Sequence, residues 1–342
     1  MLNWSRIAYL TREGGKAIED NTLVITGLRA VFPTPGGPAA AVDGVDLTVP
    51  RGTIVGLVGE SGCGKSVTAL SVMGLLPHPG RVEAGQICFD GQDLTTLSEP
   101  ARRKLRGDRM AMIFQDPMTS LNPVYSVGRQ VAEVLRLHRG LDRKAARAKT
   151  VELFRQVGIP DPAARYDAYP RQLSGGLRQR VMIAMAMACQ PDLLIADEPT
   201  TALDGTIQAQ ILRLMGQLRR DNGTAILLIT HNMGVVAQLC DQVYVMYAGQ
   251  IVEAAETFAL FAAPRHPYTL GLLGAIPSVE EERPRLYAIP GTVPDLRTPP
   301  PGCRFCPRCD RALPRCAQAV PPLTSLGDGH LVRCFRAGEE EG

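Results

Sequence analysis

The stretch Gly59-Glu60-Ser61-Gly62-Cys63-Gly64-Lys65-Ser66 decides the fold, because it fits the phosphate-binding pattern G-x-x-x-x-G-K-[ST] at every fixed position. An apolar run at 54–58 precedes it and a helix-compatible run at 67–76 follows it, so the strand, loop and helix that the pattern requires are all indicated. The glycines let backbone N–H groups turn inward around the phosphates of a nucleotide, and Lys65 supplies a full positive charge. The Ser66 hydroxyl is expected to bind Mg²⁺. A glycine-rich turn that matches by chance is the competing interpretation.

Length and composition fit a large globular domain with an appendage. The chain has 342 residues, 45% apolar and 21% charged side chains, and a formal net charge of +3. These values exclude neither an enzyme nor a binding module, and they do not indicate nucleic-acid binding. The basic clusters at 102–106 and 136–149 are interpreted as solvated helix faces rather than phosphate-binding patches. The longest apolar candidate, 181–189, is too short to span a membrane, so a role at a membrane needs a spanning partner.

The chain is predicted to divide into three parts. An N-terminal extension, residues 1–21, lacks the uninterrupted apolar centre of a secretory signal, so a cytoplasmic location is expected. A nucleotide-binding domain covers 22–255. Beyond it, the extension 256–342 is rich in proline, and little regular structure is expected there.

The predicted domain is of the α/β class. The runs 23–32 and 42–49 alternate apolar and polar residues, which indicates an N-terminal antiparallel β subdomain. From 117 to about 172, apolar residues recur at spacings of three and four, which predicts an inserted helical subdomain. An amphipathic helix is predicted at 206–220. Further strands are expected at 54–58, 85–89, 109–114, 193–196 and 225–229, with a terminal hairpin of 243–247 and 251–252.

Two adjacent carboxylates follow the strand predicted at 193–196. A phosphate loop needs a carboxylate that helps to hold Mg²⁺ and a group that activates water. Asp197 is placed to reach the metal, and Glu198, pointing to the other side, can polarise the attacking water as a general base. A solvated acidic pair is the alternative, which the position downstream of a phosphate loop disfavours.

The segment Leu173-Ser174-Gly175-Gly176-Leu177-Arg178-Gln179-Arg180 resembles the signature motif of ATP-binding cassette (ABC) ATPases, and it lies between the two nucleotide motifs as it does in that family. A serine hydroxyl and backbone N–H groups at a helix start can bind an anion. The resemblance implies a phosphate-loop core of the ABC ATPase type. It also implies that this segment, including Gln179, contacts the nucleotide of an opposite subunit, so that ATP is sandwiched in a dimer.

Other positions can be matched to the same family one at a time. The resemblance implies that Gln115 contacts Mg²⁺ and water, that His231 contacts the γ-phosphate, and that Asp204 lies in a loop crossing the dimer interface. Phe32 occupies the position of an aromatic that stacks on adenine, although a buried strand aromatic is a rival interpretation. Val67 completes the segment implied to contact ATP. Gly205 and Asn232 replace a β-branched residue and an aspartate of many relatives, and ATP turnover is expected to survive both changes.

Finer features narrow the subfamily. The segments 117–123 and 265–269 and the cysteine-bearing tail are similar to the ATPase subunits of bacterial dipeptide and oligopeptide importers. The resemblance implies a peripheral subunit on the cytoplasmic face of the inner membrane, with a second ATPase, usually a different chain, two membrane permeases and an extracytoplasmic binding protein as partners. Nickel chelates, glutathione and oligosaccharides are alternative cargoes. A DNA-repair ATPase is disfavoured because no sustained heptad run appears, and a ribosome-recycling ATPase because only one cassette is present.

Five of the nine cysteines, Cys303, Cys306, Cys309, Cys316 and Cys334, are close together in the extension. In a chain without an export signal, this spacing favours thiolate-bound metal over disulfides, as zinc or as an iron–sulfur cluster, with free reduced thiols as a further alternative. Spacing alone selects the first three. The resemblance instead implies a [4Fe–4S] cluster on Cys303, Cys309, Cys316 and Cys334, with Cys306 as an extra thiol. Its expected role is to stabilise a proline-rich segment that buries little surface.

Overall fold

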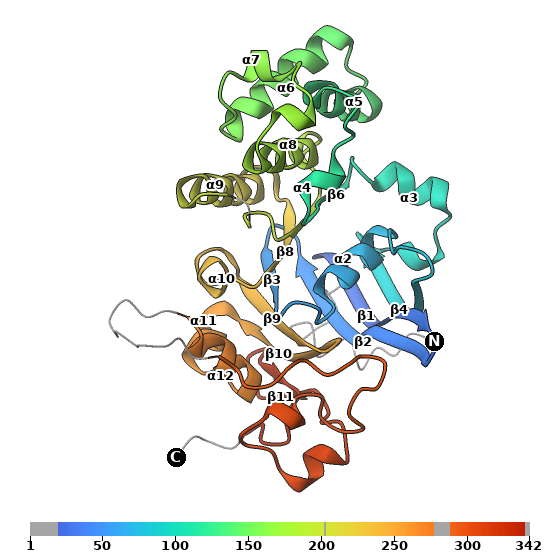
Figure 1. Ribbon diagram of the computed structural model, residues 1–342, viewed down its shortest axis with the longest axis vertical. Helices are drawn as coiled ribbons and strands as arrows, with labels where there is room; N and C mark the ends of the chain where they lie inside the picture. Colours follow the sequence, from blue (N-terminus) through green and yellow to red (C-terminus); the bar gives the residue numbers. More distant parts are fainter. Residues whose placement is uncertain (1–19, 202, 277–287, 339–342) are drawn as a thin grey trace. The chain divides into compact units, whose positions relative to one another are not determined.

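The computed structural model describes residues 20–201, 203–276 and 288–338 (Figure 1). The chain forms two compact units. The first takes its described residues from 1–49, 55–96 and 229–342, and the second consists of 50–54 and 97–228. The predicted N-terminal extension lies almost wholly outside the described residues. Within the described part of the chain, no helix combines the length and apolar character needed to cross a membrane.

A four-stranded sheet opens the first unit. Its strands are β1 (Asn21–Thr34), β2 (Gly37–Pro50), β4 (Arg81–Phe89) and β5 (Gln92–Asp93), in the order β2-β1-β4-β5. Strands β1 and β4 are antiparallel, with Leu23 opposite Phe89. Both of these side chains are fully buried, as the alternating pattern of β1 predicts.

The phosphate loop follows β3 (Ile54–Val58), whose side chains are all buried. Strand β3 pairs in parallel with β9 (Gln242–Tyr247), and β9 forms the predicted hairpin with β10 (Gln250–Glu256). Two short strands that we did not predict, β12 (Leu331–Val332) and β11 (Thr324–Ser325), continue this sheet from β10. The C-terminal extension is therefore tied into the same sheet that carries the loop.

The second unit contains β6 (Met110–Ile113), β7 (Leu193–Asp197) and the greater part of β8 (Ala225–Thr230), with β7 in the middle. Strands β6 and β7 are parallel and buried. Its helices are α3 (Glu99–Leu105), α4 (Pro117–Ser120), α5 (Val127–Arg139), α6 (Arg143–Gln156), α7 (Pro162–Arg165), α8 (Gly175–Met187) and α9 (Gly205–Asn222).

The extension contains more regular structure than its proline content predicts. Helix α10 (Met233–Leu239) precedes β9, and after β10 come α11 (Thr257–Ala262) and α12 (Pro267–Gly274). Proline at the first position of α12 favours the helix rather than breaking it, because that position has no N–H to donate within the helix. The prediction of little regular structure was therefore wrong for 257–274. Later turns of the extension include the short 3₁₀ helices η4 (Cys306–Arg308) and η5 (Pro314–Ala317).

A buried carboxylate fastens the extension to β10. Glu253 is fully buried, and its oxygens accept hydrogen bonds from the backbone of Arg265 and His266 at 2.7 and 2.9 Å. The His330 ring lies 2.7 Å from the same carboxylate. Burial raises the pKa of Glu253, but the hydrogen bonds, that of His330 foremost, outweigh it and lower the pKa overall. Segments at both ends of the extension thus share one anchor.

Candidate functional site

The phosphate loop has a backbone that only glycine accommodates at two positions. Gly59 and Gly64 adopt φ of 149° and 110°. A Cβ on Gly59 would lie 2.1 Å from the carbonyl oxygen of Met246, and one on Gly64 would lie 2.3 Å from that of Ala41. The loop therefore lies directly against the end of β9 and against β2. Gly64 is also the N-cap of α2 (Lys65–Met73), which has no side-chain cap.

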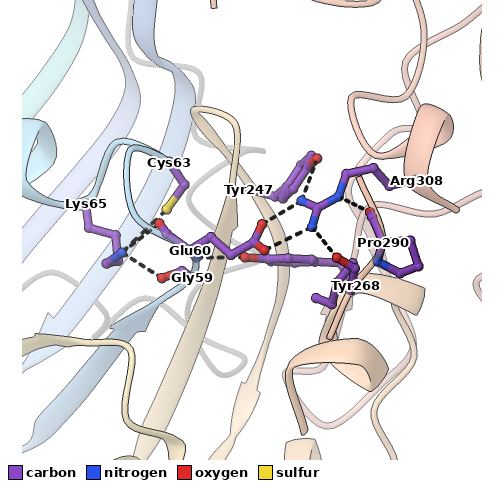
Figure 2. Close-up of polar contacts among 9 residues, drawn as sticks. Gly59, Glu60, Cys63, Lys65, Tyr247, Tyr268, Pro290 and Arg308 are labelled. Carbon is purple, nitrogen blue, oxygen red and sulfur yellow. Dashed lines mark hydrogen bonds and ion pairs between the residues drawn. The ribbon is translucent and has the colours of Figure 1, made fainter. Parts of the chain in front are cut away.

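Lys65 lies at the centre of the loop (Figure 2). Its side chain is buried, and its Nζ donates to the carbonyl oxygens of Gly59 at 2.7 Å and Glu60 at 3.0 Å. The Cys63 sulfur lies 3.8 Å from the same nitrogen. Burial raises the pKa of Cys63, with Lys65 opposing it. The loop thus surrounds a cation, which is the arrangement that phosphate binding requires.

Two further predicted residues lie at the start of α2, and a third lies on β1. Ser66 and Val67 are half-buried in the first turn of the helix. Phe32 is also half-buried, so it is not the fully buried strand aromatic of the rival interpretation. One edge of its ring covers Gly80, where a Cβ would lie 2.5 Å from a ring carbon.

In the second unit, β7 delivers the predicted acidic pair. Asp197 ends the strand and is 3% exposed, and Glu198 follows with 8% exposure. Glu198 has φ of 50°, a left-handed conformation that is uncommon for a residue with a side chain. The hydroxyl of Thr201 donates to Glu198 Oε2 at 3.0 Å. The buried strand and this hydrogen bond together fix the direction of the carboxylate.

The predicted signature segment forms the start of α8. Ser174 is its N-cap, and the Ser174 hydroxyl accepts a hydrogen bond from Leu177 N–H at 3.4 Å. Ser174 and Gly175 are exposed and Gly176 is half-buried. Gln179 differs from them, because it is 1% exposed and its amide donates to the carbonyl oxygen of Pro199 at 2.9 Å. In this structure Gln179 ties the helix to the loop after β7.

The remaining predicted residues follow the ends of elements. Gln115 is exposed between β6 and α4. Asp204 is exposed and caps α9 by accepting from Ile207 N–H at 3.0 Å. His231 is exposed after β8, in the same unit as the phosphate loop, whereas Gln115 and Asp204 lie in the other unit. Asn232 caps α10 with its Oδ1, a role that an aspartate performs equally well.

Contacts between the extension and the phosphate loop have no counterpart in the sequence reasoning. Arg308 forms an ion pair with Glu60, and the Glu60 N–H donates to the Tyr268 hydroxyl at 2.8 Å (Figure 2). Arg308 and Glu60 lie 248 positions apart in the chain. No periodicity or spacing connects residues so distant, so no sequence signal could have revealed this pair.

All five clustered cysteines line one small cavity in the extension, together with aromatic and basic side chains. The pKa of Cys303 is raised to about 11, chiefly by burial, with backbone hydrogen bonds from Phe305 and Cys306 opposing the rise. The thiols of Cys306 and Cys309 are also raised in pKa by burial. Among the residues that the structure describes, no three His, Cys, Asp or Glu side chains converge closely enough to hold a metal ion. The donor chemistry therefore fits a thiolate-bound metal, whereas a preformed metal site is not supported.

Comparisons with known proteins place these features in context. Residues 42–201 match the family described as ABC transporter, and 252–316 match the family described as oligopeptide/dipeptide transporter, C-terminal region. The chain is 50% identical over 320 residues to the dipeptide transport ATP-binding protein DppD of Escherichia coli, covering 94% of this chain and 98% of that protein. It is 52% identical over 301 residues to a probable peptide ABC transporter ATP-binding protein of Sinorhizobium fredii, covering 87% and 90%.

A solved structure gives the same result for the fold. A dimeric ATP-binding cassette in a post-hydrolysis state, bound to ADP and Pi, superposes with a TM-score of 0.64 and 24% identity. The match covers 69% of this chain and 98% of that one. This chain and the Escherichia coli dipeptide transport protein therefore match over nearly their whole length, while the solved cassette shares the fold.

Proposed function

Because this chain belongs to the ATP-binding subunits of peptide ABC transporters, we propose that it hydrolyses ATP to drive the uptake of dipeptides and oligopeptides through partner permeases. The family resemblance inferred from the sequence motifs is thereby confirmed. The peptide cargo is supported by the relatives' names and by the match to the oligopeptide/dipeptide C-terminal region. Importers of nickel chelates, glutathione or oligosaccharides remain the alternatives for cargo, because this subunit carries no cargo site that the sequence can identify.

One observation carries the proposal: a phosphate loop whose two strained glycines press against the sheet and whose lysine lies at its centre. Lys65 would bind the β- and γ-phosphates of ATP together with the N–H groups of the loop and of α2. Phe32, half-exposed on β1, would stack on adenine, with Val67 beside the phosphates. Mg²⁺ prefers oxygen ligands, and Ser66, Gln115 and Asp197 offer a hydroxyl, an amide and a carboxylate that suit it.

The hydrolytic step is assigned to Glu198 and His231. Glu198 would accept a proton from the attacking water as general base, and its carboxylate is already held by Thr201 at 3.0 Å. His231 would position the γ-phosphate from the end of β8. Mg²⁺, when bound, would neutralise charge that develops on the phosphate oxygens.

The signature segment would act on the nucleotide of a second ATPase subunit. The exposed Ser174 and Gly175 and the half-buried Gly176 lie at the start of α8, where they would make that contact, and Asp204 would lie at the same interface. The buried amide of Gln179 supports the segment rather than offering a free ligand. We infer that the complete assembly contains two ATPase subunits at the cytoplasmic face of the inner membrane, two permeases and an extracytoplasmic binding protein. A permease loop would dock on the helical subdomain around 115–123.

The cysteine cavity would hold a [4Fe–4S] cluster on Cys303, Cys309, Cys316 and Cys334, with zinc as the alternative. What supports this proposal is that five thiols, the donor type that zinc and iron–sulfur clusters prefer, line one cavity. The cysteines would have to converge further than they do in this structure. Protein purified anaerobically should be brown and contain iron and acid-labile sulfide, whereas colourless, zinc-loaded protein would overturn the cluster.

The nucleotide site is tested on the purified chain and in the transporter. Lys65→Ala should abolish detectable binding of ATP, because the loop loses its only central charge. In membranes that contain the permeases, wild-type protein should couple ATP hydrolysis to dipeptide uptake. Co-purification with permeases for another solute, or uptake of a nickel chelate in place of peptides, would overturn the peptide assignment.

A further inference from the structure

Arg308 connects the cysteine-rich extension to the phosphate loop. It lies at the end of η4, and its guanidinium donates to both carboxylate oxygens of Glu60, at 2.6 and 3.0 Å (Figure 2). The Arg308 side chain is 4% exposed and that of Glu60 is 29% exposed. A two-point pair of this kind, largely shielded from water, is stronger and more directional than a surface ion pair.

The guanidinium is fixed on its other sides as well. Its Nε donates to the carbonyl oxygen of Pro290 at 2.8 Å, and further donors reach the Ile289 carbonyl oxygen at 3.2 Å and the Tyr247 hydroxyl at 3.3 Å. The rings of Tyr247, Tyr268 and Phe305 pack against one another, with centroids 4.6 to 5.5 Å apart. Arg308 therefore has little freedom to leave Glu60.

Glu60 is held through all of its polar groups. Its carboxylate binds Arg308, its N–H donates to the Tyr268 hydroxyl at 2.8 Å, and its carbonyl oxygen accepts from Lys65 Nζ at 3.0 Å. One residue of the loop thus contacts η4, α12 and the loop lysine. A displacement of Arg308 would therefore move Glu60, which contacts Lys65 directly.

Glu60 also poses an electrostatic problem. It is the second residue of a loop built to bind a polyphosphate, and a carboxylate there repels that anion and attracts Lys65 away from it. Arg308 cancels this charge within hydrogen-bonding distance and holds the carboxylate on the side of the extension.

We propose that Arg308 is a positioning residue for ATP binding, which neutralises Glu60 and holds the phosphate loop in its binding conformation. The proposal rests on the proposed function, because it assumes that the loop binds ATP. It gives the extension a role in nucleotide affinity.

The test compares ATP dissociation constants of the full-length, purified chain in the presence of Mg²⁺. Arg308→Gln should weaken ATP binding roughly tenfold, because it leaves a bare carboxylate in the loop. Arg308→Lys keeps the charge but loses the two-point geometry, so its ATP dissociation constant should lie between those of wild type and Arg308→Gln. In the assembled transporter, Arg308→Gln should raise KM for ATP and leave kcat nearly unchanged.

A double variant, in which the Glu60 carboxylate is removed together with Arg308, decides whether the charge of Glu60 is the cause. If the Glu60 charge is what weakens binding, Glu60→Gln combined with Arg308→Gln should bind ATP within about threefold of wild type. A double variant as weak as Arg308→Gln would overturn the charge argument, and unchanged binding by Arg308→Gln would overturn the proposal entirely. The matched control is Arg315→Gln, which removes a guanidinium that contacts the Phe335 carbonyl oxygen and ring within the extension. It should bind ATP normally.

The same experiment distinguishes a failure of the proposed function from a failure of the inference about Arg308. If the wild-type chain itself binds no ATP, the nucleotide assignment fails, and the inference about Arg308 that rests on it fails with it. If wild type binds and Lys65→Ala does not, the nucleotide site stands, and only the behaviour of the Arg308 variants decides the inference. The thermal unfolding midpoint of Arg308→Gln, measured alongside, separates loss of affinity from loss of folded protein.

Discussion

At the scale of single residues, Glu198 combines a strained backbone with a fixed carboxylate. Its left-handed φ of 50° costs about 1 kcal/mol or more, and its side chain accepts a hydrogen bond from Thr201. We expect Glu198→Gln to bind ATP with normal affinity but to lower kcat by at least about 100-fold, because the amide cannot accept the proton of water. Phosphate release and ATP binding, measured on the assembled transporter, check this.

A second substitution separates strain from chemistry at the same position. Glu198→Gly removes the carboxylate and also relieves the left-handed strain, so it should raise the free energy of unfolding by about 1 kcal/mol while turnover falls as far as in Glu198→Gln. Undiminished turnover in either variant would show that another group is the base.

His266 makes stability depend on pH. It is 1% exposed, and its Nδ1 accepts from Tyr268 N–H at 3.0 Å to cap α12. Burial lowers the pKa of His266 to about 4, although Glu253 opposes this. The unfolded chain, with a histidine pKa near 6.5, therefore binds more protons between pH 6.5 and 4. The contribution of His266 to the free energy of unfolding should be fully present above pH 6.5, and that free energy should fall by about 2 kcal/mol by pH 5.

The substitution His266→Asn tests this dependence of the free energy of unfolding on pH, because asparagine can still cap the helix but does not titrate. Urea unfolding between pH 7 and 5 avoids the range in which Glu253, with its lowered pKa, loses its own contribution. The variant should lose most of the pH dependence that wild type shows. His138→Asn, at a half-buried position in α5, is the control and should keep the wild-type slope. Parallel curves for all three proteins would contradict the assignment.

At the scale of elements, the phosphate loop depends on its fit against β9 and β2. Gly64→Ala would place a Cβ 2.3 Å from the Ala41 carbonyl oxygen, so the loop must move. We expect a loss of about 3 kcal/mol in unfolding free energy and no measurable ATP binding. Gly62→Ala is the matched control, because Gly62 also has positive φ but nothing lies within 4 Å of its Cβ. It should cost only about 1 kcal/mol. Equal effects of the two changes would contradict the packing argument.

The elements show how far sequence reasoning can go. The continuous apolar run at 54–58 located β3, and periodicity located α9 to within a few residues because one apolar face determines that helix. It missed α12, since proline was counted as a breaker when it occupied the first helical position after a capping His266. The family resemblance assigned Ser174 and Asp204 only to nucleotide and interface contacts, whereas both side chains cap helices in this structure.

At the scale of the whole molecule, motifs predict which residues have a chemical role but not the contacts between distant segments. The phosphate loop and Asp197-Glu198 were predicted because their functions demand residue types at short spacing. The pair Arg308 and Glu60 was not, because ionic contacts between remote parts of a chain follow from tertiary packing alone. Five thiols lining one cavity agree with their close spacing, but spacing does not show how nearly they converge.

Coupling between that cavity and the phosphate loop follows from the chain of contacts. Arg308 lies between Cys306 and Cys309 in sequence, so loosening the cysteine-lined turns should displace its guanidinium from Glu60. We therefore expect the double substitution Cys309→Ser and Cys316→Ser to weaken ATP binding about as much as Arg308→Gln, and to add little when combined with it, because both act through one ion pair. Cys88→Ser, in β4, should leave affinity unchanged. Titration of ATP into each full-length variant measures this. Effects that simply multiply would show that the cysteines influence the loop by another route.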